Sequence, residues 1–245
     1  MPLSDLTRDG LLGPRVSFFA PDLRGRGTSR RPAADVHTMA LLADNLTEDI
    51  EELLPGAEPI VLLGLSMGGY VLLELLRRHR RRFAGRLRGL ALCDTRAGAD
   101  DAAGRERRLE AIAAIRDRGM IAASEAMLPK LLAPASRGGD AEWIVRDMVL
   151  STPPATACAD LAGMAVREDG FEALEAFEGA VLLAVGEEDE ITPPADAEAM
   201  AEALDAASYV RLLTVPGAGH LAPLEKPREV AAGLADLLRR AGRPS

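Results

Sequence analysis

Short apolar runs bounded by turn residues alternate along the chain with segments of helical periodicity. Five runs have the composition of strands: RVSFFA (15–20), PIVLLG (59–64), LRGLALC (87–93), AVLLAVG (180–186) and YVRLLTV (209–215). Helical patterns lie among and after these runs, at about 36–54, 68–83, 195–205 and 227–241. This alternation predicts an α/β fold, with a mostly parallel sheet flanked by helices.

One gap between the runs is much longer than the others. From Ala97 to about Phe177 no segment has strand composition, whereas RERRLEAIAAIRDRGM places Leu109, Ile112 and Ile115 at helical spacing. The segments EAMLPKLL and AEWIVRDMVL also have helical patterns. The sequence therefore predicts a helical insertion between two consecutive strands, large enough to form a lid.

Composition and charge narrow the classes of partner. Hydrophobic residues make up 48% of the chain and aromatic residues only 3%, so aliphatic side chains must fill the core. The formal net charge is −9 and the pI is about 5.0, which argues against nucleic acid or an anionic membrane as a partner. We interpret the one arginine-rich stretch, RRHRRRFAGRLR (77–88), as a solvated helix end.

The two cysteines and the N-terminus exclude further classes. Cys93 and Cys158 lack metal-ligand spacing, and two cysteines in a chain of 245 residues do not make a disulfide framework. The stretch MPLSDLTRDGLLG contains acidic residues and no apolar core, which does not fit a signal peptide. No window reaches the length of a membrane span. We therefore expect a soluble, cytoplasmic protein.

A candidate nucleophile lies where the second apolar run meets a helix. The run Gly64-Leu65-Ser66-Met67-Gly68 satisfies the pattern G-x-S-x-G, follows a strand pattern and opens an amphipathic helix. This context favours a nucleophile elbow over a plain turn with a small residue. The N–H of Met67, at the helix N-terminus, would then stabilise an oxyanion.

The serine needs a base, and the chain has three histidines. His79 lies in the arginine run, and His37 precedes a helix, where we expect an exposed loop residue. His220 lies in TVPGAGHLAPLEKP, directly after the last strand pattern. Because the carboxyl ends of parallel strands share one edge of the sheet, His220 can reach Ser66 and is the predicted base.

Two carboxylates are candidates to orient the base. AVGEEDEITPP offers four successive acids, of which Asp189, three residues after Gly186 and three before Thr192, is the preferred partner of His220. The rival is Asp94 in ALCDTRAG, directly after the preceding strand pattern, from which a carboxylate can also reach the histidine. If Asp94 is not catalytic, we expect it to cap the following turn.

Four segments together resemble a known superfamily: APDLRGRGTS, GLSMGGYV, GEEDEITPP and VPGAGHLAPLEKP. They look like the α/β-hydrolase superfamily, in particular the small esterase and lactonase branch near 3-oxoadipate enol-lactone hydrolases. The resemblance implies the triad Ser66, Asp189 and His220, and neither a metal nor a cofactor. It also implies a hydrolase core in two parts (1–96 and 171–245) with a helical cap (97–170).

The chain departs from this superfamily near its N-terminus. Members usually have further strands before the APDLRG segment, and the last of these ends in a His-Gly loop that supplies a second oxyanion donor. No strand-like run precedes Arg15, and no His-Gly pair occurs. We expect the 15–20 and 59–64 strands either to pair directly or to leave backbone groups unpaired. A natural protein with a longer N-terminus is favoured over a degraded hydrolase.

The predicted function is hydrolysis of a small-molecule carboxylic ester or lactone through an acyl-enzyme on Ser66. Two alternatives stay open. The same triad supports acyl transfer or perhydrolysis in haloperoxidase-like relatives, and a chain without the oxyanion loop could be a non-catalytic binding protein.

Overall fold

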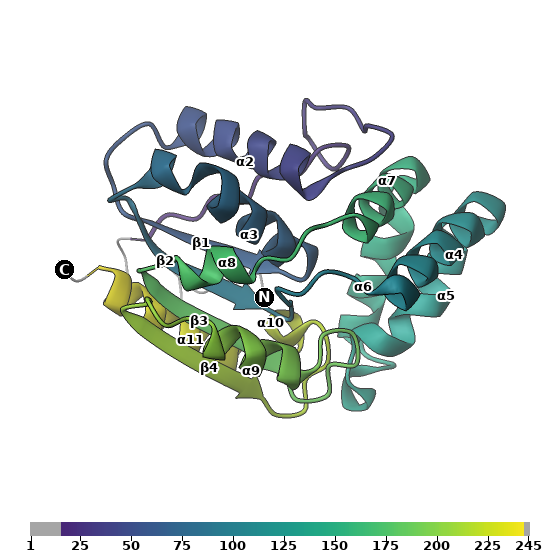
Figure 1. The fold of residues 1–245 in the computed structure, drawn as a ribbon. Coiled ribbons are helices and arrows are strands. Elements are labelled where there is room, and N and C mark those ends of the chain that lie inside the picture. The colour runs from purple at the N-terminus through teal and green to yellow at the C-terminus, as the bar shows by residue number, and fades with distance from the viewer. Residues whose placement is uncertain (1–15, 243–245) are drawn as a thin grey trace.

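The structure is a computed structural model that describes residues 16–242. One parallel sheet forms its centre, with the strands in the order β1-β2-β3-β4. The ends of neighbouring strands are in register, so that Leu65 pairs with Cys93 and Cys93 with Ala184. The carboxyl ends therefore share one edge of the sheet (Figure 1). The strands are β1 (Ile60–Leu65), β2 (Leu87–Cys93), β3 (Ala180–Gly186) and β4 (Tyr209–Val215).

The prediction of a strand at 15–20 is wrong. Residues 16–20 are irregular, and Phe18 and Phe19 are 39% and 45% exposed. A strand needs a neighbour for its backbone groups, and within residues 16–242 strand β1 pairs only with β2. Direct pairing of the two predicted strands is therefore excluded. Arg15 and the N-terminal stretch before it lie outside the described residues.

Helices cover both faces of the sheet, as the alternating pattern predicts. Because side chains alternate across a strand, Leu90 and Leu92 of β2 face one layer of helices and Ala91 and Cys93 face the other. The first layer contains α3, α8 and α9, with α2 packed on α3, and the second contains α11 (Figure 1). These helices are α2 (Met39–Leu53), α3 (Met67–His79), α8 (Phe171–Glu175), α9 (Pro194–Glu202) and α11 (Pro227–Ala241).

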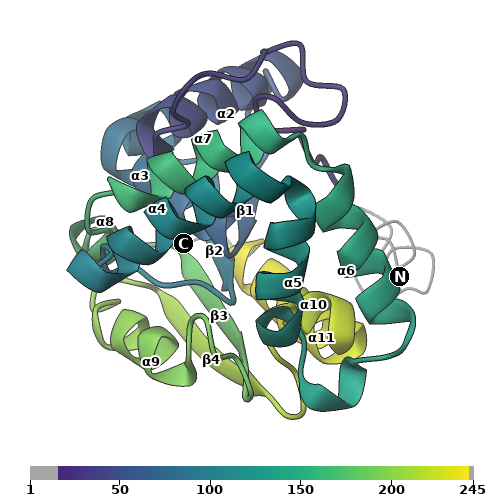
Figure 2. The ribbon, with the colours of Figure 1, turned by 90° about the vertical axis from the view of Figure 1, so that its right-hand side faces the viewer.

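The predicted insertion is helical throughout its central part. It contains α4 (Ala102–Arg118), α5 (Met120–Leu131), α6 (Asp140–Ser151) and α7 (Pro154–Ala165). These helices gather at one end of the sheet (Figure 1) and lie in front of the strands when the view is turned by 90° (Figure 2). The insertion is therefore placed over the edge where the strands end.

The buried face of α4 differs from the expected one. Ile112 and Ile115 are buried, but Leu109 is 60% exposed. At 3.6 residues per turn, Leu109 is rotated by about 120° from Ile115. It therefore points away from the neighbouring helices.

The two connections between the insertion and the core are joined to each other. The N–H of Gly170 donates to the carbonyl oxygen of Ala97 at 3.0 Å. Asp100, on the outgoing connection, is 3% exposed and pairs with Arg167 on the returning one at 2.6 Å. Its carboxylate also pairs with Arg108 of α4 and with Arg96 after β2, at 2.7 Å. One buried carboxylate thus fastens the insertion to the core.

No helix among residues 16–242 combines the length and the apolar character needed to cross a membrane.

Candidate active site

Ser66 lies on the turn between β1 and α3, as the G-x-S-x-G pattern predicts. Its φ of 51° and ψ of −116° are rarely adopted by residues other than glycine. The N–H of Ser66 donates to the carbonyl oxygen of Cys93 at 2.9 Å, which fixes the turn to β2. Met67 is the first residue of α3, where backbone N–H groups lack partners within the helix. The turn therefore places Ser66 next to the first backbone N–H groups of α3.

The two glycines of the pattern have different roles. A Cβ on Gly64 would lie 2.6 Å from the carbonyl carbon of Gly68, closer than atoms can approach. A Cβ on Gly68 would meet no atom within 4 Å. Gly64 is therefore required by the close approach of strand and helix. The space around Gly68 would admit a side chain.

His220 connects the serine to a carboxylate. It lies in the loop after β4 and is 2% exposed. Its Nε2 is 2.8 Å from Ser66 Oγ. Its Nδ1 is 2.9 Å from Asp189 Oδ2 and 3.1 Å from Oδ1. The structure thus brings the three residues named by the sequence into one chain of hydrogen bonds.

The surroundings of Asp189 favour its charged form. Its Oδ1 accepts the N–H groups of Ile191, at 2.8 Å, and Thr192, at 3.0 Å. Its Oδ2 accepts the hydroxyl of Thr192 at 2.7 Å. Burial opposes ionisation, but the hydrogen bond and charge of His220 and the bonds from Thr192 outweigh it and hold the pKa of Asp189 below its usual value. An ionised carboxylate only accepts hydrogen bonds, so Nδ1 of a neutral His220 carries the proton and Nε2 is free to accept from Ser66.

Thr192 has a role that the sequence analysis did not assign. It is 1% exposed and donates two hydrogen bonds to Asp189. The available signal was its position three residues after an aspartate, a spacing at which aspartate often accepts from the backbone. The same spacing also occurs in many ordinary turns.

Asp94, the rival acid, has no hydrogen bond to His220 in the described structure. It is fully buried, and its two oxygens accept the N–H groups of Gly186 and Ala222, at 2.9 and 3.0 Å. Neither donor belongs to the turn after Asp94, so it does not cap that turn. Burial raises the pKa of Asp94 to about 8, against the two N–H donors and with help from the charges of Asp189 and Glu225.

The prediction of an exposed His37 is wrong. The side chain is completely buried, with Nδ1 2.7 Å from Asp160 Oδ1 of helix α7. Its Nε2 accepts the N–H of Ala34 at 3.1 Å. His37 therefore joins the loop before α2 to the insertion. The third histidine, His79, is half-buried and lies 2.5 Å from Asp44.

Comparison with known proteins assigns the family. Residues 1–233 match the profile of the Alpha/beta hydrolase family. The chain belongs to the alpha/beta hydrolase family. A thermophilic esterase from Thermogutta terrifontis is 37% identical to this hydrolase, with a TM-score of 0.81 over 91% of this chain and 79% of that chain.

Two further solved structures share the fold of this hydrolase. A hydrolase from Pseudomonas aeruginosa PA01 is 25% identical, with a TM-score of 0.74 over 89% of this chain and 77% of that one. The enol-lactonase from Burkholderia xenovorans LB400 is 24% identical, with a TM-score of 0.75 over 89% of this chain and 79% of that one. No curated protein matches the chain. The predicted fold class, superfamily and hydrolase enzyme are confirmed.

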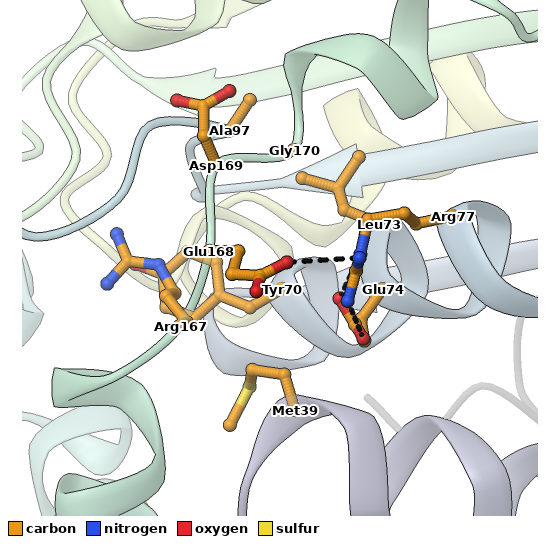
Figure 3. A pocket seen from close by; sticks show the side chains of 10 residues that line it. All are labelled: Met39, Tyr70, Leu73, Glu74, Arg77, Ala97, Arg167, Glu168, Asp169 and Gly170. Atoms are coloured by element: carbon orange, nitrogen blue, oxygen red, sulfur yellow. Dashed lines mark hydrogen bonds and ion pairs between the residues drawn. The ribbon is translucent and has the colours of Figure 1, made fainter.

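The described residues line two hollows. The first is lined by Tyr70 and Arg167, whose guanidinium lies 4.2 Å from the ring centre (Figure 3). It holds about 10 Å³ and is far too small for a substrate. The second, of about 270 Å³, lies between the loop before α2 and helices α4 and α7. Neither is lined by a residue of the hydrogen-bonded chain.

Among residues 16–242, no three His, Cys, Asp or Glu side chains are grouped as a metal site would require. The expectation that the enzyme uses neither metal nor cofactor stays a prediction.

Proposed function

We propose that the enzyme is a serine hydrolase that cleaves a small-molecule carboxylic ester or lactone. The proposal rests on one observation, the hydrogen-bond chain from Ser66 Oγ through His220 to Asp189, with distances of 2.8 and 2.9 Å. A serine hydroxyl becomes an effective nucleophile when a base takes its proton, and a carboxylate keeps the base in the required tautomer.

In the first step, Ser66 Oγ attacks the carbonyl carbon of the ester and its proton passes to His220 Nε2. The charge of Asp189 stabilises the imidazolium that forms. The N–H of Met67 donates to the oxyanion of the tetrahedral intermediate. His220 then gives the proton to the leaving alcohol oxygen, the carbon–oxygen bond breaks, and Ser66 carries the acyl group. In a lactone the alcohol remains attached to the acyl group.

In the second step, water releases the acyl group. Its proton passes to His220 Nε2 while its oxygen attacks the acyl carbon. The same N–H of Met67 again meets the oxyanion. The bond to Ser66 Oγ breaks, Oγ recovers the proton from His220, and the carboxylic acid leaves. Water is consumed, and the enzyme returns to its starting state.

The insertion is proposed as the cap of this site (97–170), between the two parts of the core (1–96 and 171–245). Leu128, Leu131 and Leu132, in and just after α5, belong to one apolar cluster with Ile191 and Leu221. Ile191 follows the Asp189 turn, and Leu221 follows His220 directly. The insertion therefore packs on both loops that carry the acid and the base, where a cap would exclude water from the substrate.

An ester is the favoured substrate class. The relative from Thermogutta terrifontis, at 37% identity, is an esterase. The enol-lactonase from Burkholderia xenovorans LB400, at 24%, supports the fold alone.

The test is intact-protein mass spectrometry before and after treatment with a fluorophosphonate, which reacts with activated serines and needs no knowledge of the substrate. We expect one adduct on the wild type and none on Ser66→Ala. Ser151, an exposed serine of α6, provides the control, because Ser151→Ala should react as the wild type does. A folded wild-type protein that forms no adduct, or a Ser66→Ala variant that still forms one, would refute the proposal.

A further inference from the structure

The end of strand β2 contacts all three segments that carry the proposed catalytic residues. The carbonyl oxygen of Cys93 accepts the N–H of Ser66 at 2.9 Å. The hydroxyl of Thr95 donates to the carbonyl oxygen of Ser66 at 2.8 Å. Asp94 lies between these two residues and is completely buried. Its carboxyl group reaches the other two segments.

Each oxygen of Asp94 accepts a backbone N–H from a different loop. Oδ1 accepts from Gly186, which ends β3 just before the turn to Asp189, at 2.9 Å. Oδ2 accepts from Ala222, which begins α10 (Ala222–Glu225) just after His220, at 3.0 Å. One carboxyl group therefore fixes the spacing between the loop of the acid and the loop of the base.

The backbone of Asp94 is held in an unusual conformation. Its φ is 45°, in the left-handed region that residues other than glycine rarely adopt. Its N–H donates to the carbonyl oxygen of Ala184 at 2.8 Å, which continues the pairing of β2 with β3. Such strain persists only where the surroundings enforce it, and it concentrates at functional sites.

We propose that Asp94 is a positioning residue, which aligns His220 with Asp189 by holding Gly186 and Ala222 together. This inference rests on the proposed function. Among the described residues, the carboxyl group of Asp94 forms hydrogen bonds with Gly186 and Ala222 and none with Ser66 or His220, so we assign it no part in proton transfer.

Asp94 interacts with the ionisable groups of Asp189, Glu225 and Cys93. The charges of Asp189 and Glu225 act on it, and it acts on the buried thiol of Cys93. Glu225 accepts the N–H of Gly219 at 2.8 Å, next to His220. A change at Asp94 therefore affects the pH dependence of the reaction through these carboxylates and through the geometry of His220.

The variant Asp94→Asn tests whether Asp94 acts through its two hydrogen bonds or only by filling space. An amide has one acceptor oxygen, and its NH₂ group would face the N–H of either Gly186 or Ala222. Asp94→Asn therefore loses one of the two bonds while keeping the shape of the side chain. Asparagine also tolerates the left-handed conformation better than most residues. Asp205→Asn, at an exposed position, is the matched control.

The experiment measures kcat, KM and the pH profile of kcat/KM with an activated ester, and the NMR signal of the proton between His220 and Asp189. We expect Asp94→Asn to lower kcat by about 10²-fold with little change in KM, since small misplacements of reacting groups cost that much. A weaker His220–Asp189 bond stabilises the imidazolium less, so the acidic limb of the profile should move to lower pH. The NMR signal should shift upfield, and Asp205→Asn should behave as the wild type.

A merely structural role would reduce the amount of folded enzyme without moving the pH limb or the NMR signal, and that outcome overturns the proposal. If Asp94→Asn does not fold, Ala222→Pro removes one donor from the other side and should give the same shifts. Proline fits the first position of a helix, where Ala222 lies. If the wild type proves inactive, the proposed function fails, while the NMR signal still tests whether Asp94 positions His220.

Discussion

Removing the charge of Asp100 should destabilise the fold far more than the same change one residue later. Asp100→Asn leaves the guanidinium groups of Arg96, Arg108 and Arg167 around an amide that can neutralise none of them. The side chains of Asp100 and Arg167 are only 1% and 3% exposed. Breaking a buried pair by removing one partner costs about 3–5 kcal/mol, because the remaining charge stays buried. We expect the free energy of unfolding to fall by about that amount.

The neighbouring residue supplies a matched control. Asp101 is exposed and is the N-cap of α4, where it accepts the N–H of Gly104 at 2.6 Å. Asparagine caps helices about as well as aspartate, so Asp101→Asn should change stability by less than about 0.5 kcal/mol. Urea unfolding at pH 7, followed by circular dichroism, measures both variants. An Asp100→Asn variant as stable as Asp101→Asn would refute the reasoning.

The pH dependence gives the same interaction a second test. Burial alone would raise the pKa of Asp100, but hydrogen bonds and charges from Arg108 and Arg167 hold it well below the usual 3.8. The unfolded chain therefore binds a proton at a higher pH than the folded protein does. The stabilisation is complete above the unfolded pKa and is lost as the pH falls below it. The difference between the wild type and Asp100→Asn should therefore shrink as the pH is lowered through 3.8.

Three further predictions concern the site. Gly64→Ala should lower the free energy of unfolding by about 1–3 kcal/mol through overpacking, whereas Gly68→Ala should leave it unchanged or raise it by up to about 1 kcal/mol; equal effects in thermal unfolding would contradict the geometry. Thr192→Val removes the hydrogen bond from the hydroxyl to Asp189, so it should lower the free energy of unfolding by about 1.5–3 kcal/mol and slow fluorophosphonate labelling. Thr192→Ser keeps the hydroxyl and should have neither effect. Because burial raises the pKa of Asp94 to about 8, ionising Asp94 costs more free energy in the folded protein than in the unfolded chain. The free energy of unfolding should therefore decline from pH 4 toward pH 8 through this group, and an Asp94→Asn variant with the wild-type slope would contradict this prediction.

The local pattern predicted most of the sheet. The runs at 87–93, 180–186 and 209–215 coincide with β2, β3 and β4, because turn residues bound each run and the apolar side chains on both faces meet helices. The run at 15–20 has a similar composition, but its described residues, 16–20, form no strand. The composition of a segment shows that it is compatible with a strand. Whether it forms one depends on a neighbouring strand, which the composition of the segment does not reveal.

The sequence predicted some residues of the candidate site better than others. Ser66 and His220 follow from motif and chain order. Asp94 and Asp189 both follow neighbouring strands, and the sequence favoured Asp189 only by its position between Gly186 and Thr192. The two aspartates differ in the direction of their side chains. Asp94 points toward the N–H of Ala222 and Asp189 toward His220, and the sequence does not show these hydrogen bonds. His37 was placed wrongly for a similar reason, because its partner Asp160 is distant in the sequence.

The bond between Ala97 and Gly170 has a consequence for how such enzymes diversify. This hydrogen bond joins the two ends of the segment between Ala97 and Gly170, so the segment forms a closed loop. The entropy cost of closing a loop grows only slowly with its length. We therefore expect that a longer or shorter segment can replace the four helices without unfolding the sheet, provided that it again covers Ile191 and Leu221. Such a replacement must also supply a carboxylate for Arg96, the partner of Asp100 that lies in the core, at 2.7 Å.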